Sequence, residues 1–290
     1  MNRFLFSIIW IFGTTLLASA QTSFFYPHVV NGMLGTTTWK TTILLTNPAS
    51  SGNATGAITF TQDNSDPISA GSSWRITLTD ETGSTTTSSV FTFMLPPGAT
   101  KKYVSTAPGG FVSGFANVTT NAGTVSGTAI FSEFDMAGNL ISEAGVPSTN
   151  PVLRQTILVD TLGGYSVGVA YANASNSIAN ISLTLLDSLG NAVATPITQT
   201  LGPGNHTQGF TSQFFRSAPP LVGTMQITSS APLIAVSLRF DPTLSKFTTL
   251  APVPLTSLIN SSIEWLQERQ RLLPLTSIAR LMESLQFRIG

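Results

Sequence analysis

The chain has 290 residues, of which 9% are charged, and its 13 basic and 13 acidic side chains balance to zero net charge. Such sparse and balanced charge excludes the basic surface that nucleic-acid binding requires, so no nucleic-acid partner is expected. The absence of cysteine excludes disulfides, thiolate metal sites and cysteine nucleophiles.

Residues 1–20 predict an N-terminal signal peptide. Asn2-Arg3 supplies a positive start, residues 4–17 form an apolar run, and Ala18-Ser19-Ala20 provides a small-residue cleavage site. The apolar run is short for a bilayer span, so cleavage is favoured over anchoring, and no other stretch predicts a transmembrane segment. We therefore expect an exported protein, secreted or at the cell surface, with the periplasm as a further location. Export without cysteine favours a bacterial source.

Residues 21–150 (repeat 1) and residues 151–253 (repeat 2) are two copies of one unit. Residues 117–131 align without a gap with residues 226–240. Two further matches lie upstream: Leu95-Pro96-Pro97-Gly98 with Leu201-Gly202-Pro203-Gly204, and Thr46-Asn47 with Ala172-Asn173. A unit of roughly 100 residues is too long for a solenoid repeat, so each copy is expected to be a domain with its own core.

Strand patterns recur through both repeats. In residues 233–240, Ile234, Val236, Leu238 and Phe240 alternate with smaller or polar residues. Residues 156–160, 166–172, 178–186 and 221–228 read as further strands, and Gly-, Asn- and Pro-containing turns separate them. No helical period precedes residue 255. The pattern predicts an all-β fold of two tandem antiparallel β-sandwich (Ig-like) domains.

Repeat 1 carries an insertion between Thr61 and Leu95, with an extra strand expected at residues 74–79. It holds four acidic residues, namely Asp63, Asp66, Asp80 and Glu81. Elaboration of one copy marks this insertion as the first place to look for a specific function. The alternative is a hairpin added at a sheet edge.

Residues 254–290 predict an amphipathic helical tail. One apolar stripe runs along its last part: Ile278, Leu281, Met282, Leu285 and Ile289. Such a tail is expected to dock on the sandwich or on a partner, whereas its mixed polar face disfavours membrane binding. Non-native read-through sequence is the alternative.

Residues 164–168 match the Gly-x-Ser-x-Gly pattern of α/β-hydrolases around Ser166, and Asp187 and His206 follow in the right order. That motif requires a sharp turn from strand to helix, whereas the residues after Ser166 continue as strand. No catalytic residue is therefore assigned. A hydrolase would instead depend on carboxylates of the insertion.

Metal ligands are sparse. His28 and His206, the two histidines, occupy unmatched repeat positions, and zinc would need both plus distant carboxylates. Calcium has weak candidates in Asp63 and Asp66, or in Glu133 with Asp135, but neither pair has the spacing of a recognised loop. We assign no metal and no cofactor.

Aromatic residues give the main hint of a binding surface. Trp39 aligns with Tyr165, so both repeats place a flat side chain at the start of the same strand, while Trp74 lies in the insertion and Tyr26 shortly before Trp39. Exposed aromatic rings beside Asn and Thr can stack on sugar rings and hydrogen-bond to them. The alternative is that Trp39 and Tyr165 cap the core at the end of the sandwich.

Three motifs carry a family resemblance: Leu45-Thr46-Asn47-Pro48, Leu95-Pro96-Pro97-Gly98 and residues 223–229. The chain up to Pro254 resembles uncharacterised secreted bacterial proteins built from tandem Ig-like or fibronectin-III-like β-sandwich repeats. The resemblance implies a surface, adhesion or carbohydrate-associated module and transfers no catalytic residue.

These observations predict an exported, non-catalytic binding or structural module that contacts polysaccharide or cell-surface material. One alternative is a protein–protein assembly or adhesion subunit that binds another extracellular protein. The other is a carboxylate-dependent hydrolase.

Overall fold

The computed structural model describes residues 22–255, and the predicted all-β class is confirmed for this part of the chain. The predicted signal peptide lies outside the described residues, as does the predicted tail beyond Leu255. The two short helical segments are the 3₁₀ turn η1 (Leu162–Gly164) and α1 (Thr211–Phe214). Within residues 22–255, no helix has the length and apolar character needed to cross a membrane.

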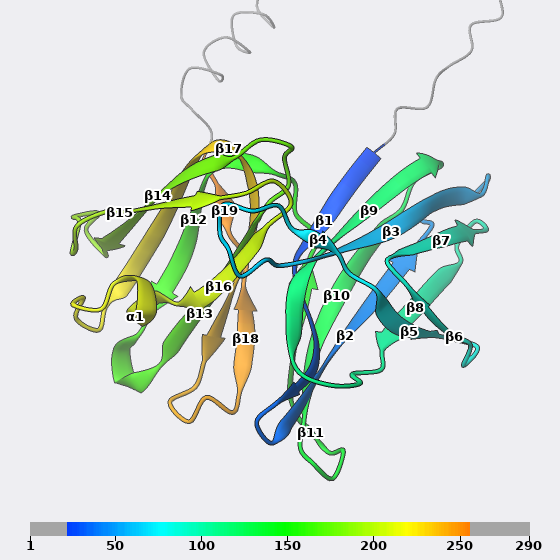
Figure 1. Cartoon of the computed structure of the whole chain (residues 1–290), viewed down its shortest axis with the longest axis horizontal. Coiled ribbons are helices and arrows are strands. Elements are labelled where there is room, and N and C mark those ends of the chain that lie inside the picture. The colour runs from blue at the N-terminus through cyan, green and yellow to red at the C-terminus, as the bar shows by residue number, and fades with distance from the viewer. Residues whose placement is uncertain (1–21, 256–290) are drawn as a thin grey trace, which may run out of the picture.

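Repeat 1 contributes one antiparallel sheet of eleven strands. Its strands are β1 (Thr22–Leu34), β2 (Thr37–Thr46), β3 (Ala54–Gln62), β4 (Ser72–Ser73), β5 (Ile76–Asp80), β6 (Thr85–Ser88), β7 (Val90–Leu95), β8 (Thr100–Ser105), β9 (Val112–Ala122), β10 (Ser126–Phe134) and β11 (Leu140–Pro147). Figure 1 shows them as the blue-to-green half of the molecule.

Repeat 2 contributes a second antiparallel sheet, of eight strands. These are β12 (Val152–Asp160), β13 (Ser166–Asn173), β14 (Ala179–Asp187), β15 (Ile197–Leu201), β16 (His206–Phe210), β17 (Val222–Phe240), β18 (Phe247–Leu250) and β19 (Val253–Pro254). They form the green-to-orange half in Figure 1.

The strands of the two repeats pair in the same order. In repeat 1, β7-β3-β9-β1 and β8-β2-β10-β11 are hydrogen-bonded neighbours. In repeat 2, β15-β14-β17-β12 and β16-β13-β17-β18 repeat this order. The long strand β17 takes the place of both β9 and β10, so one strand runs through both layers.

Each half buries its own apolar cluster. In repeat 1 the cluster includes Phe131 and also Ile43 and Ile58, which alternate with half-exposed residues along their strands. In repeat 2 it includes Ile157, Leu183, Met225 and other side chains of β12, β13, β14 and β17. The folded-over sheets therefore enclose β-sandwich-like cores.

One asparagine corner is present in both repeats. The buried amide of Asn47 donates to the carbonyl oxygens of Leu95 and Gly52, both at 3.0 Å. The equivalent Asn173 donates to Leu201 and Gly202 at 3.0 and 3.1 Å. These bonds tie the end of β2 or β13 to the Pro-Gly turn that the alignment also matches, so the two sequence motifs belong to one structural corner.

Candidate functional site

The loop that leads from β3 to β4 holds the two repeats together. It reaches across to the turn before β16, as Figure 1 shows for the blue-cyan segment near β4. The Nδ2 of buried Asn205 donates to the carbonyls of Asp66 and Ser69, both at 3.1 Å, and its Oδ1 accepts from the backbone N–H of Asn64 at 2.8 Å. The Asn205 side chain therefore provides hydrogen-bond partners for the backbone of the loop, as a neighbouring strand would, and fixes the loop on repeat 2.

His28 and His206 meet at this junction. Nδ1 of His28 and Nε2 of His206 are 3.0 Å apart and the rings are near-parallel, so the two imidazoles share one N–H···N hydrogen bond. His28 lies where the β1–β9 register shifts after Tyr26, and such a bulge re-aims a side chain. Burial, with repulsion from His206, places the pKa of His28 well below the usual 6.5.

A polar chain continues from the histidine pair. Nδ1 of His206 is 3.7 Å from Oδ2 of Asp63, which accepts a hydrogen bond of 2.6 Å from the hydroxyl of Ser113. Gln208 Nε2 donates to the same hydroxyl at 3.3 Å. Burial raises the pKa of Asp63, but the His206 ring and the Ser113 hydroxyl outweigh it, so the pKa lies below its usual value.

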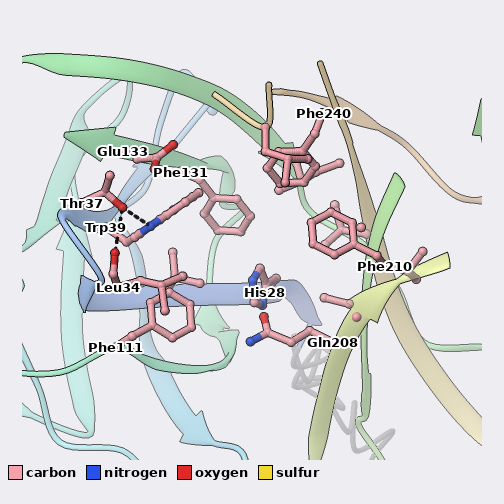
Figure 2. Close-up of a pocket in the computed structure, with 18 of the residues that line it drawn as sticks. His28, Leu34, Thr37, Trp39, Phe111, Phe131, Glu133, Gln208, Phe210 and Phe240 are labelled. Atoms are coloured by element: carbon pink, nitrogen blue, oxygen red, sulfur yellow. Dashed lines mark hydrogen bonds between the residues drawn. The ribbon is translucent and has the colours of Figure 1, made fainter. Parts of the chain in front are cut away.

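Beside the histidine pair lies a cavity of about 610 Å³, which we call the inter-repeat cleft. One wall comes from β1, β2 and β10 of repeat 1 and the other from β13, β16 and β17 of repeat 2 (Figure 2). Gly168 and Ala170 of β13 line the cleft, and the rings of Phe210 and Phe240 pack against Gly168, where a Cβ atom would lie 3.2 Å from Phe240. The aromatic lining residues are Trp39, Phe111, Phe131, Phe210 and Phe240.

An aromatic ring and a carboxyl group lie next to each other in the lining of the cleft. Trp39 on β2 pairs directly with Glu133 on β10, so both side chains lie on the same face of the sheet. Glu133 is 8% exposed, and its Oε2 is buried without a hydrogen-bond partner. Burial raises its pKa, against smaller lowering effects of Thr37 and Lys246. Trp39 Nε1 donates to the Thr37 hydroxyl at 3.1 Å.

The structure separates the four aromatic residues predicted to bind a ligand. Trp39 lines the cleft and also stacks on Phe247, with ring centroids 5.5 Å apart. Tyr26 is fully buried and Trp74, which packs edge-on against Phe60, is 5% exposed. Neither offers a ring face to a ligand, because both side chains belong to the buried cluster of repeat 1. The expectation of exposed rings at these two positions is therefore wrong.

Tyr165 lies away from the inter-repeat cleft. The guanidinium carbon of Arg239 is 3.4 Å from its ring centroid, and the same guanidinium bonds Asp160 at 2.7 Å. One face of Tyr165 is thus covered by a cation within repeat 2. The aligned positions of Trp39 and Tyr165 have different surroundings, because only Trp39 faces the other repeat.

The acidic insertion does not gather its carboxylates at one place. Asp63 faces His206, and Asp66 accepts a 2.6 Å hydrogen bond from Ser69 within its own loop. Asp80 and Glu81 lie at the β5–β6 turn, each 3.9 Å from the ammonium of Lys101. Among residues 22–255, no group of three or more His, Cys, Asp or Glu side chains is arranged to hold a metal ion.

The Gly-x-Ser-x-Gly segment is not a nucleophile elbow. Ser166 begins β13 and pairs with Phe240, as the strand prediction requires. Asp187 closes the β14 turn by accepting from the backbone N–H of Asn191 at 2.9 Å, and His206 pairs with His28. The three groups therefore form no triad.

Sequence reasoning missed the meeting of His28 with His206, which belong to different repeats. One local signal was available. Pro27 interrupts an apolar strand pattern, and a proline there marks an edge or a bulge. The wall formed by Gly168 and Phe210 had no comparable signal, because it depends on how the repeats dock.

Comparison with family models, with curated proteins and with solved structures gave no match. The resemblance to secreted bacterial β-sandwich proteins stays a prediction.

Proposed function

We propose that the chain is an exported, non-catalytic binding module made of two tandem Ig-like β-sandwich domains, and that its ligand enters the inter-repeat cleft. The partner would be a cell-surface or polysaccharide component that presents a compact group with an apolar face. Export is inferred from residues 1–20, which have the signal-peptide pattern.

The tandem-sandwich part of the proposal is supported by equivalent strand pairing. Both repeats use the same neighbour order, and both fix a Pro-Gly turn through a buried asparagine. Two cores, each with side chains from both layers of its repeat, fit two sandwich domains.

The observation that carries the binding role is the cleft itself. Its volume of about 610 Å³ lies in the range of small-molecule sites, and aromatic side chains with a few polar groups line it, as is typical of such sites. Ligand sites occur preferentially between domains. The stacking of Trp39 on Phe247 favours a ligand held in the cleft over a polysaccharide chain lying on an open aromatic platform.

The hydrolase alternative has less support. The insertion carboxylates divide between the inter-repeat junction and the β5–β6 turn, so they do not flank one site as a glycosidase pair must. The polar network of His28, His206 and Asp63 includes no nucleophile at an exposed position. A non-catalytic role fits this arrangement better.

A retention assay tests the proposal. The chain is passed over a panel of insoluble polysaccharides and cell envelopes, beside Trp39→Ala and Phe210→Ala, which remove cleft side chains of different repeats. We expect both variants to lose retention, whereas Met136→Ala, at an exposed turn, should keep it. Retention that survives both cleft substitutions would contradict the proposal.

A further inference from the structure

We propose that the inter-repeat cleft binds an amphipathic amine, with an aromatic or aliphatic body between the repeats and a protonated amino group against Glu133. This inference rests on the proposed binding role of the cleft and adds the chemical class of its ligand.

The first observation in favour of an amine ligand is the carboxyl group of Glu133. Its side chain lies in the wall of a mainly apolar cavity, and Oε2 is shielded from solvent without a hydrogen-bond partner. A buried acceptor without a partner costs free energy, and a charged one costs more. An ammonium group that donates to this oxygen would remove that cost and form a charge-assisted hydrogen bond.

The charges around the cleft complement a cation. Within residues 22–255, no lysine or arginine lines it. Lys246, whose positive charge lowers the pKa of Glu133, donates a hydrogen bond from its ammonium group to the carbonyl oxygen of Ile141. His28 is held neutral by burial and by His206. Glu133 therefore sets the sign of the potential in the cleft.

Aromatic rings next to the carboxyl group favour the same ligand class. Trp39 lies directly across from Glu133 in the β2–β10 ladder, and Phe131 lies two residues away on the same face of β10. Ammonium groups are attracted to the faces of aromatic rings, most strongly to tryptophan. A carboxylate flanked by aromatic rings can thus recognise an amine by two independent interactions.

The far wall suits the apolar body. Phe210 and Phe240 pack edge to face with ring centroids 5.4 Å apart, and both rings lie against Gly168, so the wall presents an apolar aromatic surface to the cleft. Among the described residues, no charged side chain of repeat 2 lines this wall, so a second charged group on the ligand would meet no opposite charge there. We therefore expect one amino group and one hydrophobic part.

Calorimetric titration with three probes tests this inference: naphthylethylamine, naphthylethanol and naphthylacetate, which share a body and differ in charge. We expect the amine to bind about tenfold tighter than the alcohol, the factor given by one charge-assisted hydrogen bond, and the acetate to bind weakest. Glu133→Gln should remove the preference for the amine and leave the alcohol unchanged.

Glu143→Gln is the matched control. Glu143 lies on the neighbouring strand β11, exposed and outside the cleft lining, so its substitution should leave all three affinities unchanged. Equal affinity for the three probes, or an amine preference that survives Glu133→Gln, would overturn the amine assignment. Alcohol binding lost on Phe210→Ala would still support the cleft as a site, whereas no binding of any probe would contradict both proposals.

Discussion

Single asparagine side chains hold the corners of both repeats. Asn173 is fully buried, and its Nδ2 donates to the carbonyls of Ser177, Leu201 and Gly202 at 2.7, 3.0 and 3.1 Å. Its Oδ1 accepts from the backbone N–H of Ser175 at 3.0 Å. One side chain thus replaces several backbone partners that a tight corner cannot supply.

Asn173→Ala should destabilise the fold by about 2–4 kcal/mol, because it leaves several buried carbonyl groups without a donor. The measurement is urea unfolding followed by circular dichroism. Asn180→Ala provides the control, since Asn180 has an exposed side chain on β14. A loss no larger than that of the control would show that the corner does not depend on the amide.

The histidine pair predicts a pH dependence of stability. The pKa of His28 in the fold lies well below 6.5, its value in an unfolded chain. As the pH falls, the imidazole of residue 28 is therefore protonated in the unfolded chain before it is protonated in the fold. Its contribution to the unfolding free energy is fully present above pH 6.5 and decreases below that pH. His28→Gln, which does not titrate, should flatten the curve of unfolding free energy between neutral pH and about pH 5. Parallel curves for the two proteins would contradict this account.

Strand β17 shows how far alternation predicts an element. The pattern of residues 233–240 correctly indicated a strand, but both of its faces are buried. Leu233 and Ala235 pack in the repeat 2 core, whereas Val236 and Leu238 pack in the cluster of repeat 1. Ala235 and Ser237 are small, so hydrophobic periodicity did not reveal that their face, the one toward the repeat 2 core, is also buried.

The β3–β4 loop is the second element whose role depends on contact between repeats. The backbone N–H of Gly71 donates to the carbonyl of Pro203 at 3.0 Å, and that of Gly202 to Pro67 at 2.7 Å. A Cβ atom on Gly71 would lie 1.9 Å from the carbonyl oxygen of Gly204. The glycines are thus required by close approach of two backbones. The insertion was singled out as a place for specific function; what the structure shows there is contact with repeat 2, and its acidic residues do not gather at one place.

Gly71→Ala should therefore loosen the loop from repeat 2 and lower the unfolding free energy by about 1–3 kcal/mol, the usual cost of a steric misfit. Faster proteolytic cleavage within residues 63–71 is the second expected result. Gly145→Ala is the control, because a Cβ atom there meets nothing within 4 Å. Equal cleavage rates for both variants would contradict the docking role of the loop.

At the scale of the whole molecule, the repeats share apolar surface. Ala170, Val236, Leu238 and Phe247 of repeat 2 belong to the buried cluster of repeat 1. Across the same boundary, the backbone N–H of Phe247 donates to the Ser142 hydroxyl at 3.1 Å. Neither repeat can keep this surface buried alone.

We expect the two repeats to unfold in one transition. Calorimetry should give equal calorimetric and van't Hoff enthalpies for the chain, the signature of two-state unfolding. Residues 151–255 expressed alone should be less stable, since Val236 and Leu238 would face water. Two separate transitions, with the isolated repeat as stable as in the chain, would contradict a shared core.

The sequence predicted the parts of this architecture that local pattern determines: the all-β class, several strands of repeat 2 and the Pro-Gly turns. Residues 221–228 and 233–240, predicted as two strands, belong to the single strand β17. The sequence also singled out Trp39 as a candidate ligand-binding residue, and Trp39 lies near the start of β2 in the lining of the cleft. It did not predict the inter-repeat cleft, because Glu133 and Phe210 lie in different repeats and come together only through the packing of β13 and β17 on repeat 1.

The central claim is that both repeats build one binding site. The most direct measurement is NMR chemical-shift mapping of the ¹⁵N-labelled chain during titration with naphthylethanol. We expect perturbed amides on both walls, at Phe131 and Glu133 of repeat 1 and at Gly168 and Phe210 of repeat 2. Perturbations confined to one repeat, or located outside the cleft, would contradict this claim.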